Sequence, residues 1–445
     1  QIASIPIFYT HQNNKLYSAD NTRDLVKKMN PVILNQSSIK SYLNLQAAPP
    51  NQTMINGLSD VGPHCYVVYN KTTSSLNRYN YYQVPAKIKS FHSKELLVDL
   101  AYQNFEAVFL RMKKRIELSG STVLLPLSGG MDSRLLAWAL KKFHIKNNII
   151  AFTYGTNEMN EEALISKRVA DVLGFQWRFI TYTKKKWHQL RNSLSDLLIS
   201  FPYHKSTLHL QDYLAVKELS IDYPNAILLP GHIFDHLSGL TIPLEYRYDN
   251  IFNIENNFRV ETIFDSRLVT YENHIRKTRF SSFIVNSVRT YEYFNLDFYL
   301  PYWDSDLMNF WYSLPTKLRI ERDLFKQVLA KKIYIGQYKK LSEIEYSFGR
   351  NLKVNNKHVT FNQKFKIFLK NHNLMKPLYK LLLPINEKRN KKTYQKTDYL
   401  NYYSFFFEKD FNFNKYLKRY HHLMSLLLYE HIKDELNKYN FTLLE

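Results

Sequence analysis

Residues 128–133 read Ser-Gly-Gly-Met-Asp-Ser and combine two hydroxyls, two glycines and one carboxylate in a single short turn. An apolar run that ends at Leu127 precedes the turn, and a run with helical spacing begins at Arg134. This order predicts a strand, a tight turn and a helix, whose first N–H groups and positive dipole end bind phosphate. Asp132 would repel phosphate by itself, so we expect it to hold a Mg²⁺ ion that bridges to the phosphates.

The turn differs from a Walker A loop, because no Gly-Lys-Ser/Thr sequence follows it. A turn of this composition can also be a simple Gly-Gly turn with an Asp or Ser helix cap. The number of specified positions, and their place between a strand and a helix, favour the nucleotide-binding interpretation.

A second group of polar residues follows another apolar run. Here Gly231, His232 and Asp235 place an imidazole and a carboxylate three residues apart. If its strand neighbours the strand before residues 128–133, Asp235 reaches the same Mg²⁺ as Asp132. Two carboxylates with phosphate oxygens and waters form a usual magnesium shell. Without the first turn, these residues would be interpreted as ordinary turn residues and a helix cap.

The elements that must position these turns alternate between apolar strands and amphipathic helices. Alternation of this kind predicts an α/β fold with a doubly wound parallel sheet, in which ligands bind at the carboxyl ends of the strands. Both polar turns come at such ends. The expected strands are residues 122–127, 148–153, 177–181 and 226–229, and the expected helices are residues 93–117, 134–143 and 161–173.

The two ends of the chain have other patterns. Residues 1–89 contain short apolar or alternating runs broken by Asn, Pro and Gly, which predict antiparallel strands with one helix near residues 37–45. From about residue 250 onward the pattern is mainly helical. Residues 351–400 carry 12 Lys and Arg against two acidic residues. This favours a helix that packs on its own domain, and a peripheral contact with an anionic membrane is the alternative.

The composition is that of a globular chain, with 45% hydrophobic residues over 445 positions. Its single cysteine, Cys65, excludes an internal disulfide and indicates a reducing, cytoplasmic setting. No apolar run approaches the roughly 18 residues of a membrane-spanning helix, and no export signal opens the sequence. The net charge of +22 would suit an anionic partner. A general drift in composition toward Lys and Asn also explains it, so no nucleic acid partner is expected.

Together these segments resemble the asparagine synthetase family, a branch of the PP-loop ATP pyrophosphatases. The turn at 128–133 is similar to the family's pyrophosphate loop, and the segment from Gly231 to Asp235 is similar to its second motif. Two early stretches resemble the last part of the family's glutaminase domain, so the resemblance covers roughly residues 1–350. The other similar segments are Phe152–Gly155 with Glu161 and Glu162, Tyr299–Asp304, Leu314-Pro315 followed by Lys326, and the early stretches 13–20 and 61–69.

The resemblance implies three domains. Residues 1–89 would be a remnant of a glutaminase-like, Ntn-type domain, and residues 90–350 an asparagine synthetase-like ATP-binding domain. Residues 351–445 would form a basic, mainly helical C-terminal extension.

The resemblance also implies the cofactors ATP and Mg²⁺ and the formation of an amide. A substrate carboxylate attacks the α-phosphorus of ATP, and ammonia or another amine then attacks the acyl-adenylate, so that AMP and pyrophosphate are released. Asp132 and Asp235 would hold Mg²⁺, and His232 and Asp235 would be the catalytic residues. The residues implied in ATP binding are Leu127, Ser128, Gly129, Gly130, Asp132, Ser133, Thr153 and Gly231.

The second motif departs from the family pattern Ser-Gly-Glu-Gly-x-Asp-Glu, of which this chain keeps only the first Gly and the Asp. Loss of the first Glu indicates a carboxylate other than free aspartate, with a uronic acid of a surface polysaccharide or a peptide carboxylate as candidates. The imidazole that replaces it can serve as a base at neutral pH. The replacing residues are, in order, Pro230, His232, Ile233, Phe234 and His236.

Two further functional groups of the family have no clear counterpart. The lysine that neutralises pyrophosphate has three candidates, Lys339, Lys340 and Arg350. Glutamine hydrolysis needs an N-terminal cysteine, whereas this sequence begins with Gln1 and its Cys65 falls in a strand-like run that suggests a core residue. We therefore expect no glutaminase activity from this chain.

Two alternative functions stay open. One is a non-catalytic ATP-binding member of the family, favoured by the changes in the second motif. The other is an RNA-modifying PP-loop enzyme, favoured by the basic charge, although such enzymes usually carry the loop near the start of the chain. The sequence does not indicate an oligomeric state.

Overall fold

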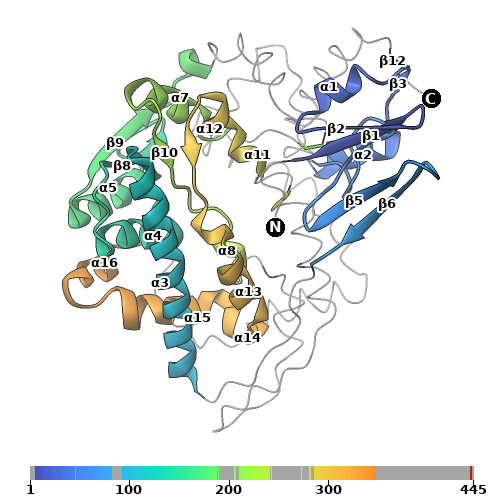
Figure 1. Cartoon of the computed structure of the whole chain (residues 1–445). Helices are drawn as coiled ribbons and strands as arrows, with labels where there is room; N and C mark the ends of the chain where they lie inside the picture. The colour runs from blue at the N-terminus through green and yellow to red at the C-terminus, as the bar shows by residue number, and fades with distance from the viewer. Residues whose placement is uncertain are drawn as a thin grey trace, which may run out of the picture.

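The computed structural model of the chain (Figure 1) describes the residues from 6 to 346 with several gaps, and a short strand near the C-terminus. The described residues are 6–45, 47–82, 93–187, 189, 205–206, 210–240, 242, 272, 280–281, 285–346 and 441–442. The basic segment 351–400, the rest of the expected extension apart from 441–442, and Arg350 lie outside them.

A five-stranded parallel sheet forms the centre of the fold, with the strand order β11-β10-β7-β8-β9. The sequence predictions of an α/β fold and of a parallel sheet are confirmed, and the strand positions agree to within about two residues. The one addition is β11, in a region that was expected to be mainly helical. The strands are β7 (Val123–Pro126), β8 (Ile149–Gly155), β9 (Gln176–Thr181), β10 (Ile227–Leu228) and β11 (Asp297–Phe298).

The chain reverses its direction of travel across the sheet between β7 and β10. It runs outward from β7 through β8 to β9, and then returns to the other side of β7 to form β10 and β11. Ile227 and Leu228 pair with Val123 and Leu124. In a doubly wound sheet, the crevice outside the carboxyl ends of two such strands is the preferred place for a ligand. The two polar turns follow β7 and β10, so both open into this crevice.

Alternate residues of the central strands pack into two different apolar clusters, because successive side chains of a strand point to opposite faces. Val123 and Leu125 lie in a cluster with α3 (Lys94–Ser119) and α4 (Met131–Lys142). Leu124 lies in a second cluster that also holds α7 (Tyr213–Asp222) and apolar residues of the N-terminal segment. The sheet is therefore covered on both faces, with α3 and α4 visible across one of them (Figure 1).

The long helix α3 has clear signals at both ends. The Ser93 hydroxyl accepts the Leu96 backbone N–H at 3.0 Å, and Gly120 ends the helix with a φ of 65°. A left-handed residue after the last turn is the usual role of glycine. The next helices are α5 (Glu161–Leu173), whose bounds match the prediction, and α4, which begins three residues earlier than predicted.

The N-terminal segment contains a three-stranded antiparallel sheet of order β2-β1-β4 and a separate hairpin, as its broken apolar runs predict. Cys65 begins this hairpin and is only partly buried, so the expectation of a core cysteine is wrong. Within the described part of the chain the hairpin strand pairs with one neighbour, and the Arg78 guanidinium lies 3.1 Å from the Cys65 sulfur. The elements are β1 (Phe8–Gln12), β2 (Lys15–Ala19), α1 (Thr22–Val26), β3 (Val32–Ile33), α2 (Gln36–Leu45), β4 (Leu58–Asp60), β5 (Cys65–Asn70) and β6 (Ser75–Asn80), with β12 (Phe441–Thr442) parallel to β3.

The described residues after β10 are mainly helical, as expected. Among the helices that the structure describes, none combines the length and the apolar character needed to cross a membrane. The helices are α8 (Phe234–Leu237), α11 (Val285–Ser287), α12 (Arg289–Tyr293), α13 (Ser305–Ser313), α14 (Thr316–Arg319), α15 (Asp323–Val328) and α16 (Lys340–Glu343).

Candidate active site

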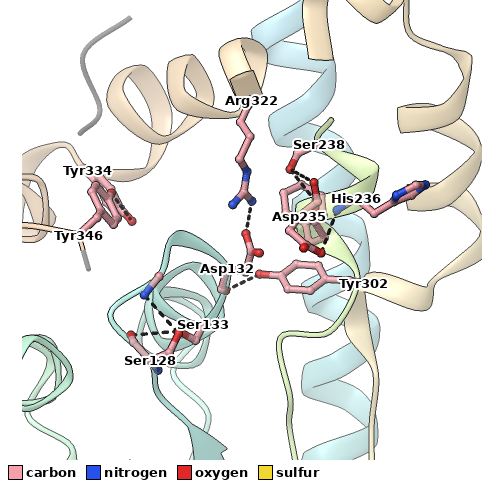
Figure 2. Close-up of polar contacts among 12 residues, drawn as sticks. Ser128, Asp132, Ser133, Asp235, His236, Ser238, Tyr302, Arg322, Tyr334 and Tyr346 are labelled. Carbon is pink, nitrogen blue, oxygen red and sulfur yellow. Dashed lines mark hydrogen bonds and ion pairs between the residues drawn. The ribbon is translucent and has the colours of Figure 1, made fainter. Parts of the chain in front are cut away.

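The turn after β7 is held closed by its own two serine hydroxyls. Ser133 Oγ accepts the Ser128 backbone N–H at 3.1 Å and lies 3.0 Å from Ser128 Oγ. Ser128 Oγ in turn accepts the Gly130 N–H at 3.2 Å. These bonds join the loop's own residues to one another (Figure 2). Gly130 caps α4 in an extended conformation, so the helix begins directly at the loop.

A carboxylate from α5 occupies part of this loop. Glu162 accepts a hydrogen bond from the Gly129 backbone N–H, the kind of donor that a phosphate would use. Burial raises the pKa of Glu162, although the Gly129 bond acts in the opposite direction.

A cavity of about 70 Å³ opens beside the loop, at the carboxyl ends of β7 and β8. Thr153 donates a hydrogen bond to the Leu127 carbonyl at 2.7 Å, and its hydroxyl lies 2.5 Å from that of Ser166. The cavity therefore brings together three residues that the resemblance assigns to ATP binding, Leu127, Ser128 and Thr153. Its full lining is Pro126, Leu127, Ser128, Phe152, Thr153, Tyr154, Glu162 and Gln211.

Asp132 stands in the first turn of α4 and has two contacts from the C-terminal helices. Its carboxylate forms an ion pair with Arg322, and its backbone carbonyl accepts the Tyr302 hydroxyl at 2.7 Å. Burial, and then the nearby charge of Asp132, raise the pKa of Tyr302 well above its usual value. Tyr302 therefore remains a neutral hydrogen-bond donor to the start of α4.

The second turn lies directly against the first. A Cβ added to Gly231 would lie 3.3 Å from the backbone N of Ser133 and 3.6 Å from Asp132 Cβ. The Phe234 ring stacks on Tyr302 with the centroids 4.7 Å apart. Because β7 and β10 are paired, the turns that follow them lie in contact, as the sequence predicts for neighbouring strands.

Asp235 and His232 point to different surroundings within this second turn. Asp235 accepts the His236 backbone N–H at 2.9 Å, in the first turn of α8 (Figure 2). His232 Nε2 lies 3.4 Å from the Ser287 hydroxyl, at the end of α11. The imidazole expected as a base therefore lies beside a hydroxyl.

Three non-glycine residues around Asp132 have left-handed backbone conformations. Ile233 has a φ of 69°, and Glu321 and Arg322 have φ values of 53° and 64°. For such residues, above all a β-branched one, this conformation costs on the order of 1–3 kcal/mol and persists only where the surroundings impose it. Left-handed backbone thus occurs both in the second turn and at Arg322, the ion-pair partner of Asp132.

The described residues fit a magnesium ion that protein and nucleotide hold jointly. Among them there is no group of three or more His, Cys, Asp or Glu side chains that could hold a metal ion alone. Magnesium is usually bound by one or two carboxylates together with substrate phosphates and waters. Asp132 and Asp235 carry carboxylate oxygens, which are ligands of the kind that such a site needs.

Sequence reasoning missed Arg322, whose ion pair with Asp132 depends on an element 190 positions further along the chain. The two described candidates for a phosphate-binding cation, Lys339 and Lys340, are exposed. Nothing in the local pattern around Arg322 marks it, because its ion pair with Asp132 depends on how the short turn Ile320–Arg322 lies against the start of α4.

Comparisons with known proteins agree with the central part of this description. Residues 110–198 match the family model described as asparagine synthase. The chain is also 20% identical, over 172 residues, to asparagine synthetase (glutamine-hydrolyzing) 1 of Bacillus subtilis strain 168. That alignment covers 38% of this chain and 26% of the relative, so the chain spans about a quarter of the relative's length.

Among solved structures, one similar to this chain is a U34-tRNA thiolase from Methanococcus maripaludis, described with its 4Fe–4S cluster. The two are 12% identical with a TM-score of 0.25, and the match covers 58% of this chain and 85% of that one.

Proposed function

Because the chain is a divergent member of the asparagine synthetase-like family, we propose that it is an ATP-dependent ligase that forms an amide. In the proposed reaction, a carboxylate attacks the α-phosphorus of ATP to give an acyl-adenylate and pyrophosphate. Ammonia or another amine then attacks the acyl carbon, and AMP leaves. The fold would accordingly be that of the PP-loop ATP pyrophosphatases.

One observation carries this proposal: the loop after β7 and the turn after β10 meet where the sheet reverses. The loop offers backbone N–H groups and a helix N-terminus to phosphates, and the cavity next to it would receive the rest of the nucleotide. The second turn adds a carboxylate and an imidazole on the side where a substrate carboxylate would have to approach. A phosphate site and acid–base groups in one crevice are what adenylation requires.

The chain's own residues would act mainly by positioning and electrostatics. Ser128 and Ser133 keep the loop in shape, so the start of α4 would be held ready as negative charge builds on the leaving pyrophosphate. Glu162 would have to release the Gly129 N–H to phosphate when ATP binds. A bound Mg²⁺, held by Asp132 and Asp235, would neutralise charge on the leaving group.

The acceptor carboxylate is proposed to be a uronic acid of a surface polysaccharide or a peptide carboxylate, not free aspartate. The basis is His232, which stands where the family carries a Glu. His232 lies next to the Ser287 hydroxyl, and in this proposal it would take a proton from the attacking amine.

The test is ATP–pyrophosphate exchange with a panel of carboxylates, because exchange requires a working adenylation site. We expect exchange only with a suitable carboxylate, and with a uronic acid or a peptide in preference to aspartate. ATP binding without exchange across the whole panel would instead support a non-catalytic, ATP-binding member of the family.

An RNA-modifying enzyme is the second candidate, and the net charge of +22 is the observation that favours it. Binding of tRNA that weakens steeply with salt, together with an absence of carboxylate-dependent exchange, would replace the ligase proposal with this one.

A further inference from the structure

Among the residues that the structure describes, Arg322 places a buried guanidinium at the candidate phosphate site. It forms an ion pair with Asp132, and its side chain is 5% exposed. Asp132 lies in the first turn of α4, directly after the loop that would hold the phosphates. Figure 2 shows Arg322 reaching down from its helix toward the top of that loop.

Arg322 is held in place from several sides. Its guanidinium carbon lies 4.6 Å from the ring centroid of Phe325 and 5.7 Å from that of Phe234. Its own backbone and that of Glu321 are left-handed, which is costly for residues other than glycine. A side chain fixed by two rings and a strained backbone loses little freedom when it binds a ligand, which favours tight binding.

The group also has hydrogen-bonding capacity that Asp132 does not use. A guanidinium has five N–H donors, and the Asp132 ion pair uses Nη2. Among the described residues, Nε of Arg322 has no hydrogen-bond partner. Arginine binds phosphate through two parallel N–H···O bonds, which a lysine cannot do.

We propose that Arg322 binds the pyrophosphate portion of ATP, the β- and γ-phosphates, and that its ion pair with Asp132 is the arrangement of the nucleotide-free protein. On this account, Asp132 is neutralised by Arg322 before ATP arrives. When ATP binds, the guanidinium turns to the phosphate oxygens and Asp132 becomes a ligand for the metal ion. This inference rests on the proposed function, because it assumes that residues 128–133 hold phosphates.

The experiment is calorimetric titration of the full chain with inorganic pyrophosphate, with and without Mg²⁺. We expect Arg322→Gln to weaken pyrophosphate binding about 10- to 100-fold, as expected for the loss of charge-assisted hydrogen bonds. Arg322→Lys keeps the positive charge but lacks the two parallel N–H donors of the guanidinium. It should therefore weaken pyrophosphate binding less than Arg322→Gln does. The matched control is Arg111→Gln, because Arg111 also pairs with an aspartate, Asp304, but is 43% exposed and away from the loop. It should bind pyrophosphate as the wild type does.

A second pair of variants separates phosphate binding from simple neutralisation of Asp132. In the Asp132→Asn background no carboxylate at position 132 needs a counter-ion, and metal-free pyrophosphate should bind at least as tightly as to the wild type. If Arg322 binds phosphate, adding Arg322→Gln to this background still weakens metal-free binding about 10-fold. If the addition changes nothing, Arg322 is only the structural partner of Asp132, and the proposal is overturned.

The outcomes distinguish this inference from the function on which it rests. Pyrophosphate binding that depends on Arg322, with no exchange for any carboxylate, would retain the phosphate site and reject the ligase. Carboxylate-dependent exchange with pyrophosphate binding indifferent to Arg322 would retain the ligase and reject the inference. If Arg322→Gln does not fold, pyrophosphate binding by Arg322→Lys and by the double variant Asp132→Asn with Arg322→Gln provides the test. A wild type that binds neither pyrophosphate nor ATP overturns both.

Discussion

The two turns of the candidate site are built in opposite ways. The turn after β7 is closed by hydrogen bonds between its own serines and its own backbone. The turn after β10 is held from outside. Arg319 donates to the carbonyls of Leu237 and His236, at 2.8 and 3.4 Å.

Aromatic packing supplies the rest of the support for the second turn. The Phe234 ring contacts four other aromatic rings, with centroid separations between 4.7 and 5.3 Å. The self-contained turn is thus determined by its local sequence, whereas the supported turn depends on residues that arrive much later. This difference is consistent with a second turn that differs from the pattern of the family it resembles and still lies against the first turn. The four rings belong to Phe105, Tyr302, Trp311 and Phe325.

The largest expected effect comes from removing the carboxylate of the first turn. Asp132→Asn should lower ATP–pyrophosphate exchange roughly 1,000-fold or more, because the leaving group would lose a ligand of its metal ion. Asp235→Asn should lower exchange less than Asp132→Asn does. Asp235 belongs to the turn after β10, which residues outside it hold in place. Exchange left intact in Asp132→Asn would contradict the assigned role of this residue.

The outside support of the second turn can be broken at Gly239. This residue has a φ of +93°, and an added Cβ would lie 2.3 Å from the Arg319 carbonyl oxygen. Gly239→Ala should therefore lower the free energy of unfolding by more than about 3 kcal/mol, measured by urea denaturation. Gly120→Ala is the matched control, because Gly120 has a φ of +65° with nothing within 4 Å. Gly120→Ala should lower the free energy of unfolding by only about 1 kcal/mol. If both variants lost the same free energy of unfolding, that result would argue against close packing at Gly239.

The support of the second turn also includes a titrating group. Asp212 lies at the start of α7, which leads to β10, and it accepts the Tyr291 hydroxyl at 2.6 Å. Burial raises the pKa of Asp212 to about 6 from its ordinary 3.8, although the Tyr291 bond acts in the opposite direction.

A raised pKa in the folded state means that the unfolded chain loses this proton first. The contribution of protonated Asp212 to the free energy of unfolding is therefore fully present below about pH 4. It is lost as the pH rises through about 6. Asp212→Asn should therefore become more stable relative to the wild type between pH 4 and pH 7, by roughly 2 kcal/mol. Urea denaturation at the two pH values measures this, and a constant difference would show that Asp212 titrates normally.

The smallest expected effect is at the contact between the turns. Gly231→Ala places a methyl group 3.3 Å from the Ser133 backbone N, so one of the turns must shift by a few tenths of an ångström. We expect roughly 10-fold weaker exchange with little change in stability, since small misplacements of reacting groups are costly. Gly174, which follows α5, is not a suitable control position. Its φ of +72° would strain any added side chain by itself. Ala139→Gly on α4, away from the loop, would show whether a change in α4 alone lowers exchange.

The sequence predicts the elements that local patterns determine. The bounds of α5, the approximate strands of the parallel sheet and the position of the first turn follow from apolar spacing and from the Ser-Gly-Gly run. The meeting of the two turns follows from parallel strands being neighbours. The hydrogen bonds that close the first turn also lie within six residues of chain, and this is why its sequence is informative.

The rest of the candidate site depends on distant packing, which no local pattern records. Arg322 reaches Asp132 across 190 positions, and Tyr302 does so across 170. The contact of Glu162 with Gly129 depends on how α5 lies against the loop. Ile233 is in a left-handed conformation that its residue type disfavours, and only the surrounding structure can impose it.

The most direct test of the account is the identity of the nucleotide product. ATP labelled at the α-phosphorus, incubated with the full chain, Mg²⁺, ammonium and a panel of uronic acids and peptides, should give labelled AMP only when a carboxylate is present. The yield should fall to background in Asp132→Asn. Labelled ADP, or AMP formed at the same rate without a carboxylate, would contradict the claim that the two turns form an adenylation site.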